Sequence, residues 1–149
     1  MARADRRRGP EAERLQAQAA AHGDRITFRE QVPSTEMPAL YPQVDVLVLP
    51  SLTRPNWKEQ FGRVLVEAMA SGVPVIGSDS GAIPDVIGDA GLITPEGDAA
   101  ALAEALRRVR DEATLRAELA AKGRQRVLER FTHAQVAADT VEVYRMMLG

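Results

Sequence analysis

Short apolar runs alternate with helical repeats along most of this chain. Residues 44–50 (VDVLVLP) and 73–77 (VPVIG) are nearly unbroken apolar runs of strand length, which is typical of strands buried on both faces. Shorter runs at residues 25–31 and 91–94 predict two further strands. Because helical patterns separate these runs, we expect a parallel sheet of the α/β class.

The helical segments carry start and stop signals. Ser34 or Thr35 can cap two turns over residues 37–43 (MPALYPQ). Gly62 opens the next helix, whose apolar repeat ends at Gly72. That repeat consists of Val64, Leu65, Ala68 and Met69.

Both ends of the chain are expected to be helical. A helix from Pro10 to a stop at Gly23 follows a ragged basic end. Asp98 caps a helical C-terminal tail that breaks near Asp111 and again at Thr132, which caps the last helix. We therefore predict a single domain over residues 1–149, with the basic end at 1–9 and the C-terminal helices at 98–149.

Composition narrows the function classes. The 149 residues contain no cysteine, which excludes disulfides, thiolate nucleophiles and cysteine metal sites. A net charge of −2 and 4% aromatic residues argue against a nucleic-acid partner. The apolar runs are too short for a membrane span and no secretory signal is visible, so the cytoplasm is the expected location.

Two carboxylates mark the candidate chemistry. Open parallel sheets bind ligands at the carboxyl ends of their strands, which here are the loops at residues 51–63 and 78–85. Glu59 lies in the first loop and Glu67 follows eight residues later in a helix. Ionised carboxylates there suit the paired hydroxyls of a sugar, and Gly62 allows backbone amides to approach an anion. The alternative is structural: Glu67 pairs with Arg63, and Glu59 is a loop acid near a positive helix end.

The same stretch carries a resemblance to a known family. EQFGRVLVEAMASGVPVIGS, preceded by VDVLVLPS and followed by SGAIPDVIGDAGLITPEGD, resembles the C-terminal domain of the family 4 (group 1) retaining glycosyltransferases. The likeness covers nearly the whole chain. It implies the donor-binding half of a GT-B fold, a Rossmann-like parallel sheet flanked by helices with a helical tail. It also implies an N-terminal truncation, since the first strands of this domain and the acceptor-binding domain are missing.

The resemblance implies roles for individual residues. Glu59 matches the catalytic glutamate that binds hydroxyls of the transferred sugar. Glu67 matches the glutamate that holds the nucleotide ribose. Phe61, Gly62 and Arg63 match the turn that lies against the sugar and the diphosphate.

Two further segments are less distinctive. Val32 and Pro33 match the segment whose main chain contacts the base, with a plain strand-to-helix turn as the alternative. The loop at residues 78–82 borders the same cleft, or has a structural role only. Residues 29–31 (REQ) stand where the family usually carries a glycine, so the base specificity cannot be read from the sequence.

The implied function is the transfer of a hexosyl unit, with retention, from a UDP- or GDP-sugar to an acceptor such as a glycan or a lipid. The resemblance implies no metal and no cofactor, and membrane association only through the parent enzyme. Half of a cleft cannot stabilise the departing diphosphate, so the chain alone is expected to be inactive. The alternatives are a non-catalytic interaction module and another GT-B enzyme, such as a nucleotide-sugar epimerase or a phosphorylase.

Overall fold

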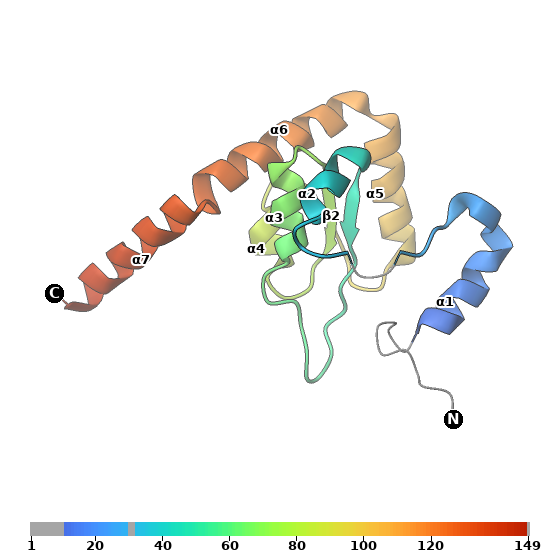
Figure 1. Ribbon diagram of the computed structural model, residues 1–149, viewed down its shortest axis with the longest axis horizontal. Helices are drawn as coiled ribbons and strands as arrows, with labels where there is room; N and C mark the ends of the chain where they lie inside the picture. The colour runs from blue at the N-terminus through green and yellow to red at the C-terminus, as the bar shows by residue number, and fades with distance from the viewer. Residues whose placement is uncertain (1–10, 30–31, 149) are drawn as a thin grey trace. The chain divides into compact units, whose positions relative to one another are not determined.

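The chain divides into two compact units, Met1–Met37 and Pro38–Gly149. The computed structural model describes residues 11–29 and 32–148 (Figure 1). The predictions for the basic end at 1–9, for Pro10 and for residues 30–31 lie outside the described residues.

The first unit is a helix followed by an extended segment. Helix α1 (Ala12–Ala19) continues into the 3-10 helix η1 (Ala20–Arg25), where Gly23 has a φ of 59°. The backbone leaves the helical conformation at Gly23, where the helix stop is predicted, although the 3-10 helix resumes and runs to Arg25. The predicted strand within residues 25–31 is wrong for the residues described there: Ile26 is extended, with φ −120° and ψ 118°, but residues 26–29 join no strand ladder. An extended segment becomes a strand only when a neighbour accepts its backbone hydrogen bonds.

The second unit is built on a parallel sheet. Strands β1 (Leu47–Leu49), β2 (Val75–Ser78) and β3 (Leu92–Thr94) pair in the order β1-β2-β3. The predicted parallel sheet is therefore confirmed. Strand β2 is buried along its length, whereas β1 is only half-buried. The predicted full burial of the 44–50 run is wrong, because β1 has β2 as its one strand neighbour among the described residues.

Helices cover both faces of this sheet. Helices α3 (Arg63–Ala70) and α4 (Ile83–Ile87) pack on one face and α5 (Ala99–Asp111) on the other (Figure 1). The α5 side holds a cluster formed by Ile76, Ala105, Val109 and Leu119. Helix α2 (Met37–Leu40) and the 3-10 helix η2 (Tyr41–Gln43) provide the two turns predicted before β1.

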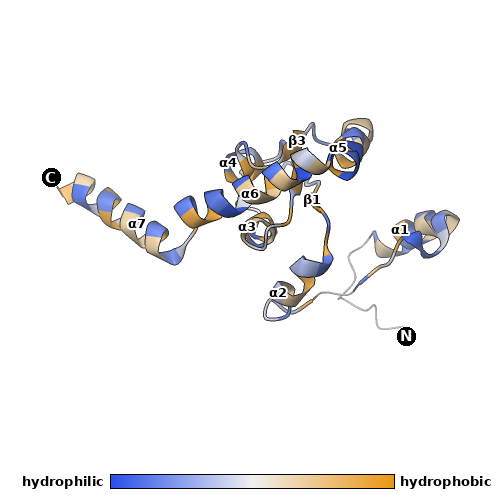
Figure 2. Ribbon diagram, turned by 90° about the horizontal axis from the view of Figure 1, so that it is seen from above, coloured by the Kyte–Doolittle hydropathy of each residue, from blue (hydrophilic) through white to orange (hydrophobic). Residues whose placement is uncertain are grey.

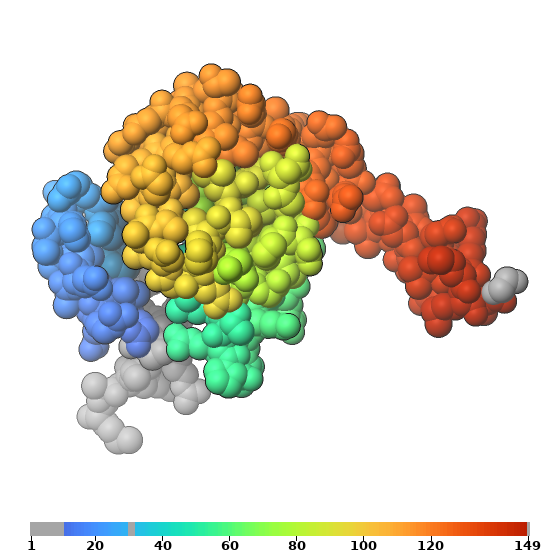
Figure 3. All heavy atoms as spheres, turned by 180° about the vertical axis from the view of Figure 1, so that it is seen from behind, coloured from blue at the N-terminus to red at the C-terminus, as the bar shows by residue number. Residues whose placement is uncertain are grey.

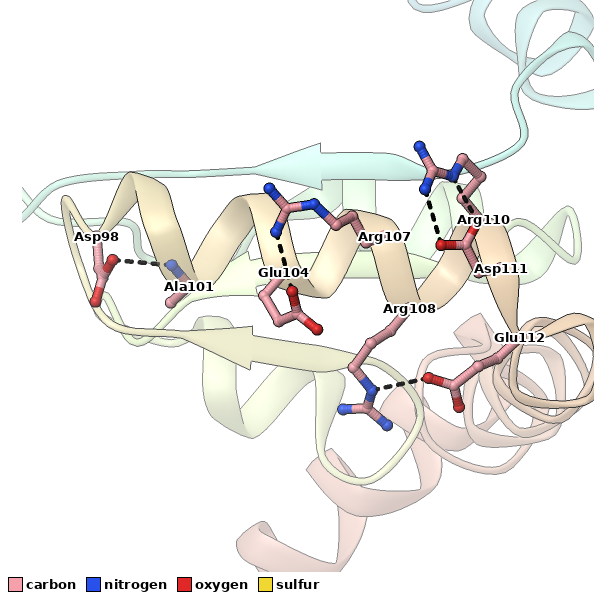
Figure 4. A network of polar contacts seen from close by, with 8 residues as sticks. All are labelled: Asp98, Ala101, Glu104, Arg107, Arg108, Arg110, Asp111 and Glu112. Atoms are coloured by element: carbon pink, nitrogen blue, oxygen red, sulfur yellow. Dashed lines mark hydrogen bonds and ion pairs between the residues drawn. The ribbon is translucent and has the colours of Figure 1, made fainter.

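The predicted caps of the C-terminal helices are present. The Asp98 side chain accepts the Ala101 N–H at 2.9 Å and opens α5, whose exposed face carries local ion pairs (Figure 4). Helix α6 (Ala113–Arg130) follows, and Thr132 Oγ1 accepts the Gln135 N–H at 3.2 Å before α7 (His133–Leu148). The predicted helix breaks are thereby confirmed.

Helix α6 packs closely against α3, and α7 follows α6 in the chain. The α6 residue Gly123 lies so close to α3 that a Cβ there would be 3.0 Å from Met69 Cγ. Hydrophobic and hydrophilic residues alternate along α7 (Figure 2), which extends away from the rest of the second unit (Figure 3). None of the helices within residues 11–29 and 32–148 is long and apolar enough to cross a membrane.

Candidate binding site at the strand ends

The loops that follow β1 and β2 are joined by hydrogen bonds. Ser78 Oγ donates to the Ser51 carbonyl oxygen at 2.6 Å, and the Ala82 N–H donates to the Glu59 carbonyl oxygen at 3.0 Å. The hydroxyls of Thr53 and the fully buried Ser80 lie 3.0 Å apart. The structure thus brings together the two loops that the sequence predicted as the ligand-binding edge.

The loop after β3 adds a third member to this edge. The Glu96 carboxylate accepts hydrogen bonds from the Thr53 hydroxyl and from the Thr53 N–H, the latter at 2.7 Å. The Glu96 N–H in turn donates to Asp79 Oδ1 at 2.7 Å. The hydrogen bonds from Thr53 lower the pKa of Glu96. Glu96 was not among the predicted site residues, although it follows a predicted strand as Ser51 and Ser78 do.

Gly81 allows the two loops to meet. Its φ is +56°, and a Cβ built on it would lie 2.0 Å from the Glu59 carbonyl oxygen. The obstacle is backbone, so a side chain could be accommodated only by moving the chain at Glu59. The position of the first candidate carboxylate therefore depends on a glycine in the neighbouring loop.

The Glu59 side chain turns back onto the start of α3. Its Oε1 accepts the Gly62 N–H at 3.0 Å and the Phe61 N–H at 3.4 Å. Its Oε2 has one long contact, with Ser51 Oγ at 3.5 Å. Glu59 is thus the loop acid near a positive helix end that the structural alternative describes, and Oε2 retains acceptor capacity.

Gly62 begins α3 in a conformation that favours glycine. It has a φ of +74°, and a Cβ would lie 2.9 Å from Leu65 Cδ1. The exposed Phe61 beside it packs edge-on against Phe131, with ring centroids 5.8 Å apart. Both aromatic rings line an open hollow of about 560 Å³ together with residues of α4, α6 and α7.

The Glu67 carboxylate is held from two sides. Arg63 Nε donates to its Oε1 at 2.6 Å, and the Tyr41 hydroxyl donates to its Oε2 at 2.6 Å. The i,i+4 pair with Arg63 is the one that the structural alternative predicted. The Glu67 side chain nevertheless remains 27% exposed, so a ligand can reach it.

Tyr41, which contacts Glu67 together with Arg63, was not among the predicted site residues. It is 2% exposed and lies 26 residues before Glu67 in the chain. Burial, together with the hydrogen bond to Glu67, raises the pKa of Tyr41, so its hydroxyl stays protonated and donates. Neither spacing nor periodicity links the two residues, so the sequence contains no signal for this contact.

The predicted site residues fall into two groups. Glu59, Phe61, Gly62, Arg63 and Glu67 come together at the start of α3. Val32 and Pro33 belong to the first unit, where the Pro33 carbonyl accepts the Glu36 N–H at 2.9 Å in a turn. Their predicted contact with the base stays a prediction.

No metal site can be assigned within the part of the chain that the structure describes. Among the described residues, no group of three or more His, Asp or Glu side chains could hold a metal ion. The expected independence of the reaction from metal ions stays a prediction.

Known proteins are similar to this chain in sequence and in fold. Residues 7–112 match the family model described as glycosyl transferases group 1. The chain is 38% identical to phosphatidyl-myo-inositol mannosyltransferase of Mycobacterium leprae over 139 residues, which is 92% of this chain and 36% of that protein. It is 40% identical over 118 residues to MMP alpha-(1->4)-mannosyltransferase of Mycolicibacterium hassiacum, covering 76% of this chain and 27% of the relative.

Solved structures agree with these matches. Sucrose-phosphate synthase from Thermosynechococcus elongatus superposes with a TM-score of 0.78 and 33% identity, over 94% of this chain and 35% of that one. The Anabaena protein HepE, solved with UDP-glucose, shares the fold with a TM-score of 0.76 at 22% identity, over 91% of this chain and 36% of its own. The chain thus spans about a third of the length of these proteins.

Proposed function

Because the chain belongs to the group 1 glycosyltransferases, we propose that it is the donor-binding part of an enzyme that transfers a hexosyl unit from a nucleoside-diphosphate sugar. The transfer proceeds with retention of configuration at the sugar. The acceptor is of the kind that such enzymes use, such as a glycan or a lipid.

The observation that carries the proposal is the arrangement of donors around Glu67. An ionised carboxylate has about four lone-pair positions, two on each oxygen. Arg63 occupies one position on Oε1 and Tyr41 occupies one on Oε2, which leaves one acceptor position on each oxygen. Two acceptors on one carboxylate match two neighbouring hydroxyls, such as those of a ribose.

The diphosphate and the transferred sugar are assigned to the start of α3. The Phe61 and Gly62 N–H groups donate to Glu59 Oε1, so it is the partial positive charge at the N-terminus of α3, and not these two donors, that favours the diphosphate. Glu59 Oε2, with its single long contact to Ser51 at 3.5 Å, is the acceptor for hydroxyls of the sugar. In this assignment the hydrogen bonds that Glu59 Oε1 accepts hold the loop in place, while Oε2 accepts hydrogen bonds from the sugar hydroxyls.

The remaining parts of the proposal rest on the family likeness. The main chain of Val32 and Pro33 contacts the base of a UDP- or GDP-sugar, and no cofactor or metal takes part. The acceptor is held by a domain outside this chain, so the chain alone binds the donor without completing the transfer. We place the protein in the cytoplasm, with any membrane contact made through the parent enzyme.

A thermal-shift panel of UDP, GDP and their sugars tests donor binding. A ligand that binds the folded state raises its stability by RT ln(1 + [L]/Kd), so at least one nucleotide should raise the melting temperature of the wild type. Glu67→Ala should reduce this rise, because the contacts to the ribose hydroxyls are lost. The matched control Glu104→Ala, which removes an exposed glutamate paired with Arg107 on α5, should retain it. Equal shifts in Glu67→Ala and the wild type, or no shift with any nucleotide, would contradict the proposal.

A further inference from the structure

We propose that Tyr41 is a positioning residue that makes this site selective for ribonucleotides. Its hydroxyl fixes the Glu67 carboxylate in the orientation that accepts both hydroxyls of the ribose. The inference rests on the proposed role of Glu67, and it concerns a residue that neither the motif nor its spacing marks.

The geometry favours Tyr41 over Arg63 as the residue that sets this orientation. Tyr41 is 2% exposed and donates to Glu67 Oε2 at 2.6 Å. A buried aromatic side chain with two torsions cannot follow a moving carboxylate. The Arg63 side chain is 72% exposed, and exposed ion pairs on long side chains hold a geometry weakly. The fixed point of the Glu67 side chain is therefore the tyrosine hydroxyl.

The Tyr41 hydroxyl also determines which lone pairs remain for the ligand. While the Tyr41 hydroxyl donates to one lone pair of Glu67 Oε2, the other lone pair of that oxygen remains available to a second donor. Without the hydroxyl, the carboxylate can rotate about its terminal torsion, which is broad, and binding must restrict that rotation. Because Tyr41 is buried, it acts through Glu67 rather than by touching the nucleotide.

The predicted consequence concerns the ribose hydroxyls alone. Replacing Tyr41 by phenylalanine should weaken the binding of a ribonucleotide about tenfold, equivalent to about 1.4 kcal/mol. The binding of an analogue without the 2′ and 3′ hydroxyls should not change. A role in folding alone would weaken both ligands equally.

Titration calorimetry of the full 149-residue chain provides the test. UDP and GDP are each compared with their 2′,3′-dideoxy analogues, for the wild type, Tyr41→Phe and Glu67→Gln. Tyr144→Phe is the matched control, since it removes the same hydroxyl from a tyrosine that is 60% exposed on α7. The wild type and Tyr144→Phe should prefer the ribonucleotide, and the other two variants should lose most of that preference.

The outcomes separate the two proposals. If Glu67→Gln loses the preference and Tyr41→Phe keeps it, the role of Tyr41 is overturned while the ribose role of Glu67 stands. If Tyr41→Phe weakens both ligands equally, Tyr41 is structural only and the inference fails. A wild type that binds no nucleotide, or that binds both forms equally, overturns the proposed function and the inference with it.

A second measurement uses the wild type alone and needs no Tyr41 variant. With tyrosine carbons labelled, the wild type gives signals from only two tyrosines, Tyr41 and Tyr144. The Tyr41 ring signal should move when the ribonucleotide is added and stay in place with the dideoxy analogue, while Tyr144 moves with neither. A Tyr41 signal that responds equally to both ligands would refute the inference.

Discussion

Gly81→Ala perturbs the contact that places Glu59. Gly81 has a φ of +56°, and the added Cβ would lie 2.0 Å from the Glu59 carbonyl oxygen and 2.9 Å from its carbonyl carbon. Since both atoms belong to the backbone, the clash cannot be relieved by a change of rotamer. The two loops must separate, and the hydrogen bond from the Ala82 N–H to the Glu59 carbonyl oxygen must lengthen or break.

The magnitude can be built from three contributions. A left-handed conformation costs a residue with a Cβ about 1–2 kcal/mol. Overpacking against atoms that cannot move aside costs about 1–3 kcal/mol, and the lost hydrogen bond costs about 1 kcal/mol. We therefore expect Gly81→Ala to lower the free energy of unfolding by about 3–6 kcal/mol. For a chain of this size that corresponds to a melting temperature lower by roughly 6–24 °C.

Gly72→Ala separates the clash from the backbone strain. Gly72 has a φ of +74°, and a Cβ there would meet nothing within 4 Å, so it should cost only about 1–2 kcal/mol. Urea unfolding followed by circular dichroism measures both variants. Equal destabilisation by the two substitutions would refute the reasoning, because it would mean that the contact between Gly81 and Glu59 contributes nothing beyond the strain.

Three further predictions follow from the fold and the site. Asp98→Ala removes the acceptor for the Ala101 N–H, and thermal unfolding should show a loss of about 1 kcal/mol; unchanged stability would exclude the cap. Because folding raises the pKa of Tyr41, its contribution to stability is complete below the ordinary tyrosine pKa of about 10 and declines as the pH rises above it. The wild type should therefore lose more stability than Tyr41→Phe in urea titrations at high pH, and parallel losses would argue against a buried phenol. The purified chain should show no sugar transfer in a radiolabelled donor assay, and measurable turnover would disprove the need for a further domain.

The alternating pattern predicted most of the second unit because each element carried its own local signal. The parallel strands were visible as apolar runs, and Asp98 and Thr132 marked helix starts by local hydrogen bonds that depend on neighbouring residues only. Glu59 and Glu67 could also be identified from the sequence, since the eight residues that separate them lie within one loop and one helix. Their roles stay predictions, because the contacts within the chain fit the structural alternative as well.

The features that escaped prediction depend on partners far away in the sequence. The run at residues 25–31 has strand-like composition, but its described residues have no strand to pair with. Tyr41 meets Glu67 across 26 residues, and Glu96 meets Thr53 across 43. Each of these contacts is set by how the elements pack, and no local rule connects the residues involved.

The central claim is tested most directly by locating the residues at which a nucleotide sugar binds. Amide spectra of the 16.2 kDa chain can be recorded during titrations with UDP-glucose and with GDP-mannose. The account predicts that at least one donor shifts the signals of Phe61, Gly62 and Glu67 at the start of α3, and leaves those of Glu104 and Arg108 on the exposed face of α5 in place. Shifts centred on another part of the chain, or no response to either donor, would contradict it.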